Sequence, residues 1–135
     1  MSIAILGCGH WGQNLVRNFH ALGSLSAVYD PTEKGRQRAR ELAPSASILE
    51  SFEDVLASSR IRAVVIATPA ETHFSLASRA LAAGKDVFVE KPLAVNYHQG
   101  VELHQAAQKA GLVLMVGHLL EYHPAVLKLR ELICA

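Results

Sequence analysis

The chain opens with a short apolar segment that runs straight into a glycine-rich turn. Residues 3–6 are Ile-Ala-Ile-Leu, the composition of a buried strand, and Gly7, Gly9 and Gly12 follow in a G-x-G-x-x-G pattern. An amphipathic helical pattern comes next, and then a second apolar segment at residues 25–29. A strand, a glycine turn, a helix and a strand in this order predict the first unit of an α/β fold with a parallel sheet.

Each glycine of the turn has its own physical role. The first lets the chain turn sharply, the second lets a pyrophosphate approach bare backbone, and the third lets the helix pack closely on the strand. Backbone N–H groups and the positive end of the helix dipole then favour phosphate. We therefore expect Gly7, Gly9 and Gly12, with the backbone of His10 and Trp11, to hold the diphosphate of a dinucleotide. The Trp11 ring either covers that cofactor or packs in the core.

The helix after the turn carries Leu15, Phe19 and Leu22 at helical spacing, which indicates a core-facing stripe. Gly23 is well placed to end this helix.

Asp30 ends the second apolar segment, 18 residues after Gly12. At this spacing an acid accepts hydrogen bonds from the adenosine ribose, and its charge repels a 2′-phosphate, so NAD is favoured over NADP. The alternative is a helix N-cap, with Pro31 as the first helical residue and Glu33 as the third. A carboxylate has two oxygens, so both roles can coexist. The basic residues at 34, 36, 38 and 40 could hold a 2′-phosphate, but their spacing is more typical of a solvated helix face.

The remainder of the chain alternates predicted strands and helices. Six strands with intervening helices predict a doubly wound, mostly parallel six-stranded sheet of the Rossmann type, as one domain over residues 1–135. The strand order 3-2-1-4-5-6 would place a ligand at the carboxyl ends of strands 1 and 4. Helices are predicted at 31–43, from 51, at 71–83, from 96 to about 111, and at 124–133. Two of them begin with a capping pattern, Ser51/Asp54 and Asn96/Gln99. Further strands are predicted at 48–50, 63–67, 86–90 and 112–117.

Composition excludes several classes of partner. With 13 basic and 12 acidic residues the net charge is +1, which gives no electrostatic case for nucleic acid or an anionic membrane. We expect no membrane span and no signal peptide. Cys8 and Cys134 lie at opposite ends of the sequence, which favours a reducing cytoplasm over a disulfide framework. Cys8 is either a reactive thiol near the phosphates or a small packing residue. The histidines lack metal-ligand spacing, so no metal site is expected.

Three segments together resemble a known family. Residues 7–12, residues 67–73 with their T-P-x-x-x-H pattern, and residues 84–93 with Glu-Lys-Pro are similar to the glucose–fructose oxidoreductase/inositol dehydrogenase/rhizopine-catabolism (Gfo/Idh/MocA) family. The resemblance covers the whole chain but only the N-terminal half of the family pattern. It implies an NAD(P)-dependent oxidoreductase acting on sugars, cyclitols or related alcohols. Residues 116–126 look most like the nucleotide-sugar dehydrogenase branch, although Glu121 stands where an arginine is common.

The family pattern also implies roles for single residues. Lys91 of Glu-Lys-Pro is the expected catalytic residue and a cofactor contact, because alcohol oxidation needs a side chain near the hydroxyl to handle its proton. The alternative is a solvated loop lysine paired with Glu90, which is itself expected to position the nicotinamide ribose. Thr68 and Pro69 either line the nicotinamide end of the cleft or simply end a strand. His73 either approaches the cofactor or lies on the surface; His118 faces substrate, core or solvent, and His123 begins a helix.

Two functional hypotheses follow. In the first, the chain is the cofactor domain of a sugar dehydrogenase, and a second α/β domain, absent from this sequence, supplies the catalytic histidine and much of the substrate pocket. That domain would come from the remainder of the protein or from a partner chain. In the second, the chain is a nucleotide-binding module without turnover. Uncovered apolar residues of the last helix, Val126, Leu129 and Ile133, could drive homo-oligomer formation.

Overall fold

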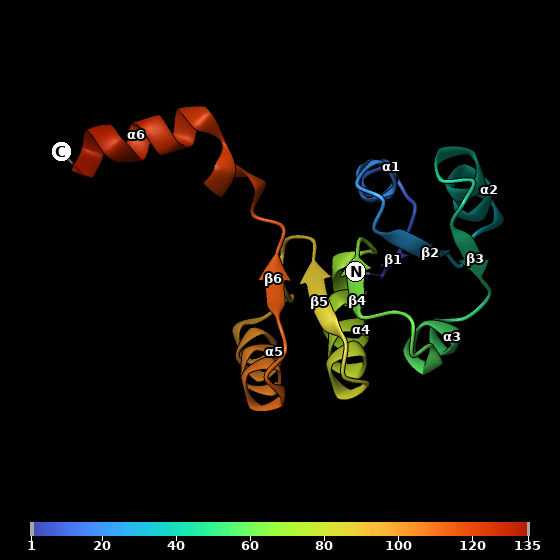
Figure 1. Ribbon diagram of the computed structural model, residues 1–135. Coiled ribbons are helices and arrows are strands. Elements are labelled where there is room, and N and C mark those ends of the chain that lie inside the picture. The colour runs from blue at the N-terminus through green and yellow to red at the C-terminus, as the bar shows by residue number, and fades with distance from the viewer. Residues whose placement is uncertain (1, 135) are drawn as a thin grey trace.

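A computed structural model describes residues 2–134 and confirms the alternation of strands and helices (Figure 1). Most predicted boundaries agree within one or two residues; the strand predicted at 112–117 is shorter. The elements are β1 (Ile3–Leu6), α1 (Gly12–Ala21), β2 (Leu25–Tyr29), α2 (Glu33–Leu42), β3 (Ser47–Leu49), α3 (Phe52–Ala57), β4 (Ala63–Ile66), α4 (Ala70–Ala82), β5 (Asp86–Val89), α5 (Tyr97–Ala110), β6 (Leu114–Val116), the 3-10 helix η1 (Leu119–Tyr122) and α6 (Pro124–Cys134).

The sheet has the predicted order β3-β2-β1-β4-β5-β6, and every neighbouring pair of strands is parallel. Leu6 at the end of β1 pairs with Tyr29 of β2 on one side and with Ile66 of β4 on the other. The carboxyl ends of the strands therefore lie along one edge. The order reverses between β1 and β4, which is where a doubly wound sheet forms a ligand crevice.

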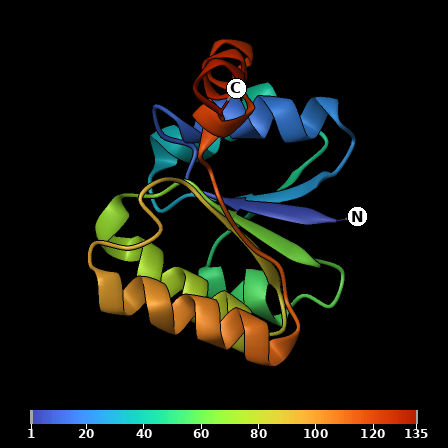
Figure 2. The same ribbon diagram turned by 90° about the vertical axis from the view of Figure 1, so that its left-hand side faces the viewer.

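Two apolar clusters hold helices against the two faces of the sheet (Figure 2). Ile5 of β1 packs in one cluster with Leu15 and Val16 of α1, and Leu6 packs in the other with residues of α3, α4 and α5 such as Leu103. Alternate residues of one central strand thus enter both layers, as expected for a strand buried on both faces.

The predicted stripe of α1 is partly wrong. Leu15 is buried and Phe19 is half-buried, but Leu22 is 74% exposed beyond the end of the helix, and Val16 takes its place in the core. Gly23 follows with a φ of +65°, so the chain turns there as expected.

The predicted helix caps are largely confirmed. Ser51 and Asp54 form a reciprocal capping box at α3. Asn96 caps α5 by accepting a hydrogen bond from the backbone N–H of Gln99, but the side-chain Oε1 of Gln99 has no partner, so the second half of that pair is missing. α5 ends at Gly111 in the left-handed conformation.

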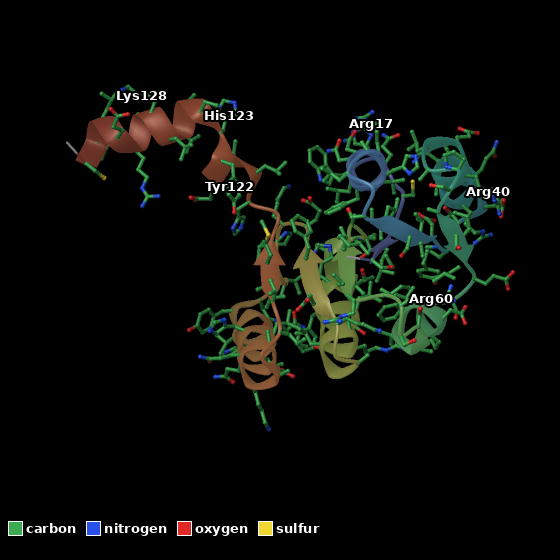
Figure 3. The ribbon with its side chains drawn as sticks, viewed as in Figure 1. Arg17, Arg40, Arg60, Tyr122, His123 and Lys128 are labelled. Carbon is green, nitrogen blue, oxygen red and sulfur yellow. The ribbon has the colours of Figure 1, made fainter. Side chains whose placement is uncertain are left out.

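η1 and α6 project away from the sheet (Figures 1 and 2). All residues of α6 that the structure describes are exposed, and Tyr122, His123 and Lys128 lie on this segment apart from the other helices (Figure 3). His123 precedes α6 and accepts a hydrogen bond from the backbone N–H of Ala125, which confirms it as a helix-start residue. Between residues 2 and 134, none of the helices has the length and apolarity required to cross a bilayer.

Candidate functional site

The glycine turn joins the carboxyl end of β1 to α1, and its three glycines face different surroundings. Gly7 has a φ of +92°, and a Cβ there would lie 2.8 Å from the carbonyl oxygen of Ala67. A Cβ at Gly12 would lie 2.1 Å from the carbonyl oxygen of Gly7, whereas nothing lies within 4 Å of a Cβ at Gly9. Chain packing therefore requires glycine at 7 and 12, while Gly9 leaves exposed backbone open to a ligand.

The backbone donors of the turn are available. The N–H groups of His10 and Trp11 form no hydrogen bond with any residue between 2 and 134, and α1 begins at Gly12 without a side-chain cap. Such groups beside the positive end of a helix suit an anion. Trp11 is 44% exposed, so its alternative placement in the core is wrong.

Asp30 joins this turn to the start of α2. It is only 5% exposed, and its Oδ2 accepts a hydrogen bond from the backbone N–H of Cys8 at 2.7 Å. Its Oδ1 accepts from the backbone N–H and the hydroxyl of Thr32, at 2.8 and 2.7 Å. Because each carboxylate oxygen has two lone pairs, Oδ2 keeps one for a further donor. The geometry is compatible with a ribose hydroxyl, and the ribose role stays a prediction.

The predicted helix cap at Asp30 is wrong. Thr32 caps α2 by accepting a hydrogen bond from the backbone N–H of Gly35 at 3.0 Å, and the helix begins at Glu33, not at Pro31. A Cβ at Gly35 would lie 2.1 Å from the carboxyl carbon of Asp30. The glycine inside α2 therefore lets the acid lie directly against the helix.

Two arginines of α2 turn back toward the glycine turn. The Nη1 of Arg36 donates to the carbonyl oxygen of Asp30 at 3.0 Å, and the Nη1 of Arg38 donates to the carbonyl oxygen of Cys8 at 2.7 Å. Both are half-buried, so a solvated helix face is the wrong description of these two residues. A 2′-phosphate would compete with backbone carbonyls for their guanidinium groups.

A cleft of about 700 Å³ opens beside the turn, where the segments after β4, β5 and β6 meet. It brings together four of the predicted site residues, Trp11, Thr68, Glu90 and Lys91, and places His118 with them. The other predicted site residues, which are His10, Asp30, Pro69, His73 and the three glycines of the turn, are not part of its lining. The full lining is Trp11, Ala67, Thr68, Glu90, Lys91, Gly117, His118, Leu119, Leu120 and Glu121.

Glu90 carries an unpartnered oxygen in this cleft. The residue is 7% exposed, and its buried Oε1 has no hydrogen-bond partner, while Oε2 accepts only a long bond of 3.3 Å from the backbone N–H of Lys91. A Cβ at Gly117 would lie 2.9 Å from Oε1, so this glycine leaves room for the carboxylate. A buried acceptor without a partner costs free energy until a donor reaches it, and ribose hydroxyls are suitable donors. This feature, the free turn N–H groups and the open Gly9 together fit a nicotinamide dinucleotide.

Lys91 follows Glu90 with its side chain exposed at the edge of the cleft. The ion pairs found between residues 2 and 134 do not include a Lys91–Glu90 pair, so that alternative has no support in the structure. An exposed amine at the mouth of a cleft is free to contact a ligand oxygen. Its catalytic role stays a prediction.

The segment after β4 is held by side-chain hydroxyls. Thr72 donates to the carbonyl oxygen of Pro69 at 2.7 Å, and the hydroxyls of Thr68 and Thr72 lie 2.6 Å apart. Because the hydroxyl proton of Thr72 is used on Pro69, Thr68 is the donor of the second bond. Thr68 thus both follows the strand and lines the cleft, while the exposed Pro69 precedes α4.

The surface interpretation of His73 is wrong. This residue is 1% exposed, and its ring lies between two backbone carbonyls. Nδ1 is 2.7 Å from the carbonyl oxygen of Pro92, and Nε2 is 2.9 Å from that of Thr68. Direct contact between His73 and the interior of the cleft is not found, so a cofactor contact stays a prediction.

Sequence reasoning missed Gly35, Gly117 and the inward turn of Arg36 and Arg38. A lone glycine within a helical pattern, as at 35, is the signal that could have shown a close approach to a neighbouring group. The sequence contains no comparable signal for the two arginines, because tertiary contacts determine which basic residues of α2 are half-buried.

Two other predictions concern cysteines and metals. Cys8 is fully buried, and burial raises the pKa of its thiol above the ordinary value, with a lowering effect of Arg38 and a further raising effect of Asp30. It is a packing residue rather than a reactive thiol. Within residues 2–134, His, Cys, Asp and Glu side chains form no group of three or more that could hold a metal ion.

The fold and the cleft define a dinucleotide-binding domain of the Rossmann type. A family model described as an oxidoreductase family with an NAD-binding Rossmann fold matches residues 1–118. The chain therefore belongs to the Gfo/Idh/MocA oxidoreductase family, and NAD is the cofactor type that this family model describes.

Named relatives differ in the reactions that their names state. The chain is 34% identical over 132 residues to a UDP-N-acetylglucosamine 3-dehydrogenase of Acidithiobacillus ferrooxidans, covering 97% of this chain and 41% of the relative. The solved structure of that enzyme has a TM-score of 0.87 at 33% identity, covering 97% of this chain and 42% of the other. A 2,7-anhydro-N-acetylneuraminate hydratase of Escherichia coli is 33% identical, covering 98% and 36%. An inositol 2-dehydrogenase of Gluconacetobacter diazotrophicus is 33% identical, covering 98% and 41%.

The chain thus spans about two fifths of the length of these relatives, 36% to 41%.

Proposed function

We propose that this chain is the cofactor-binding half of an NAD-dependent oxidoreductase that transfers hydride between a nicotinamide and a hydroxyl of a sugar or nucleotide sugar. The observation that carries the proposal is the composition of the cleft. The exposed Lys91 and the carboxylate of Glu90, which carries an unpartnered oxygen, line the cleft together with Trp11 of the glycine turn. Binding alone does not need an amine at the mouth of the cleft.

Each residue then has a defined task. The turn N–H groups of His10 and Trp11 bind the diphosphate, and Asp30 accepts a hydrogen bond from the adenosine ribose through its remaining lone pair. Glu90 accepts from the ribose next to the nicotinamide, which gives its buried oxygen a partner. When bound, NAD supplies the hydride acceptor.

Lys91 acts on the substrate oxygen. Its side chain is exposed at the cleft, and the Nζ of a lysine donates hydrogen bonds. An ammonium beside a hydroxyl oxygen stabilises the negative charge that develops as the proton leaves. By the family resemblance, the group that accepts this proton is a histidine of a second domain.

The substrate class follows from relatives whose names include a UDP-N-acetylglucosamine dehydrogenase and an inositol dehydrogenase. Glu121 also lines the cleft and is exposed. The proposed substrates are therefore of two classes, nucleotide sugars and uncharged cyclitols. A panel that contains myo-inositol and UDP-N-acetylglucosamine separates them.

A second domain completes the site in this proposal. No residue between 2 and 134 covers the apolar residues of η1 and α6. They form the surface on which the second domain or a second copy of the chain would pack.

Both cysteines are free, in agreement with the proposed cytoplasmic location.

The alternative is a nucleotide-binding module without turnover, and one experiment distinguishes the two. Trp11 is the single tryptophan of the chain and lines the cleft, so its fluorescence reports NAD or NADP binding directly. NADH formation is then followed with the sugar panel, in the wild type and in Lys91→Met. Lys109→Met is the matched control, because Lys109 is an exposed lysine of α5 outside the cleft.

Turnover that is lost in Lys91→Met but kept in Lys109→Met, with NAD affinity unchanged in both, supports the oxidoreductase. Because the oxidoreductase proposal needs the second domain for turnover, the assay is run with that domain present, and NAD binding without turnover of any substrate then supports the module. If neither NAD nor NADP changes the fluorescence of Trp11, both hypotheses are contradicted.

A further inference from the structure

We propose that His73 is a positioning residue that fixes the segment carrying Lys91, because its two ring nitrogens lie within hydrogen-bond distance of the carbonyl oxygens of Thr68 and Pro92. The role of Lys91 rests on the function proposed above, but the bracing of its segment does not. The ring is 1% exposed, and the two nitrogen–oxygen distances are 2.9 Å and 2.7 Å.

The two carbonyls belong to two of the three segments that meet at the cleft. Thr68 follows β4 and lines the cleft, and Pro92 is the neighbour of Lys91 after β5. His73 lies in the first turn of α4, a helix that packs against the sheet in the larger apolar cluster. The ring therefore ties both segments to a packed helix.

The Lys91 segment has few other hydrogen bonds, although Leu93 packs against the larger apolar cluster. Among the hydrogen bonds of residues 2–134, the bond between His73 and Pro92 is the one that joins residues 91–95 to another element. The remaining bond of Lys91 is the 3.3 Å contact of its backbone N–H with Glu90, its own neighbour. Losing the ring would leave the backbone next to the amine without a fixed partner.

A pair of isosteric variants separates the two bonds. The amide nitrogen of asparagine can occupy the place of Nδ1, and that of glutamine the place of Nε2. His73→Asn therefore keeps the bond to Pro92, and His73→Gln keeps the bond to Thr68. His73→Phe removes both bonds while preserving an aromatic ring, and circular dichroism checks the fold of each variant.

The readout is the acylation rate of Lys91 by acetic anhydride, measured by mass spectrometry against Lys109 of the same molecule. We expect the ratio of the two rates to change about fivefold in His73→Phe, as for one lost hydrogen bond, and less in His73→Asn than in His73→Gln. An unchanged rate ratio in a folded His73→Phe variant overturns the proposal. A rate ratio that is closer to the wild-type value in His73→Gln than in His73→Asn overturns it as well. If the phenylalanine variant does not fold, the comparison of asparagine with glutamine still decides.

The acylation measurement needs no substrate, so absent NAD binding by Trp11 fluorescence would refute the proposed function without altering its result.

Discussion

On one side of the cleft, the glycine turn is surrounded by groups that specify its shape; on the other, residues 119–134 contact little besides each other. The turn is fixed by the Asp30 carboxylate, by the Arg38 guanidinium and by backbone oxygens that leave no room at Gly12 for a Cβ. In contrast, Leu120 and Ile133 are 69% and 74% exposed, and all residues of η1 and α6 that the structure describes are exposed.

This difference shows that the conformation of the turn and that of α6 have different causes. The turn is specified within the domain itself, because its partners come from β2, α2 and the segment after β4. α6 is formed from good helix-forming residues and a stripe of apolar side chains, and its stripe lacks cover between residues 2 and 134. Variants of the turn should therefore change folding and cofactor binding, whereas variants of α6 should change only association.

The largest effect is expected from Gly12→Ala. Its Cβ would lie 2.1 Å from a backbone oxygen, which no side-chain rotation can relieve, so we expect a loss of at least about 3 kcal/mol in the free energy of unfolding. Urea denaturation followed by circular dichroism measures it.

Gly9→Ala is the matched control, since nothing lies within 4 Å of its Cβ. Its stability should stay within about 1 kcal/mol of wild type, while NAD affinity falls by about tenfold or more because the methyl group holds the pyrophosphate off the backbone. An equal loss of stability in both variants would show that Gly12 and Gly9 do not have separate roles in packing and in binding.

The next largest effect is expected from Asp30→Ala. The change leaves the buried N–H of Cys8 without its acceptor, and we expect a cost of about 1–3 kcal/mol. It also removes the charge that opposes a 2′-phosphate, so the ratio of NAD to NADP affinity should fall. Asp30→Asn is the control, since it keeps one acceptor oxygen. Unchanged discrimination between the two cofactors in Asp30→Ala argues against contact with the ribose.

The same contrast explains which features could be predicted from the sequence. The strands, the glycine turn and the capping box at Ser51 follow from local patterns, the sheet order follows from the rule for doubly wound folds, and all are found. The Thr32 cap is local too, but Asp30 was expected in its place because its contact with the distant backbone N–H of Cys8 has no local signal, and neither has the contact of the buried His73 with Pro92. Leu22 fits a helical period but lies beyond the last turn of α1.

α6 provides the third prediction. Leu129→Ser is expected to change the stability of the domain by less than about 0.5 kcal/mol, because Leu129 is 56% exposed. Leu103→Ala in α5, where the side chain is fully buried, should cost about 2–5 kcal/mol. Sedimentation at several concentrations tests association: a species heavier than the monomer that disappears in Leu129→Ser would show that the stripe is an interface. A clear destabilisation of a monomer by Leu129→Ser would show that α6 packs on the domain.

The smallest effect concerns the two cysteines. Burial raises the pKa of the Cys8 thiol and hides its sulfur, whereas Cys134 is exposed on α6. Iodoacetamide should therefore modify Cys134 much faster, as peptide mapping can measure. Because the unfolded chain loses the Cys8 proton at lower pH than the folded chain does, alkaline conditions above the ordinary thiol pKa should slightly favour unfolding. A Cys8→Ala variant with the same alkaline loss would assign that loss to other groups.

The close contacts at Gly7 and Gly12 affect how loss of nucleotide binding could be recognised in the sequences of related domains. Those two positions are constrained by sterics alone, so a lineage that abandoned its nucleotide would still retain both glycines. Only the middle position is free of that constraint, and drift there, toward alanine or serine, would be the first mark of a domain that had given up its coenzyme.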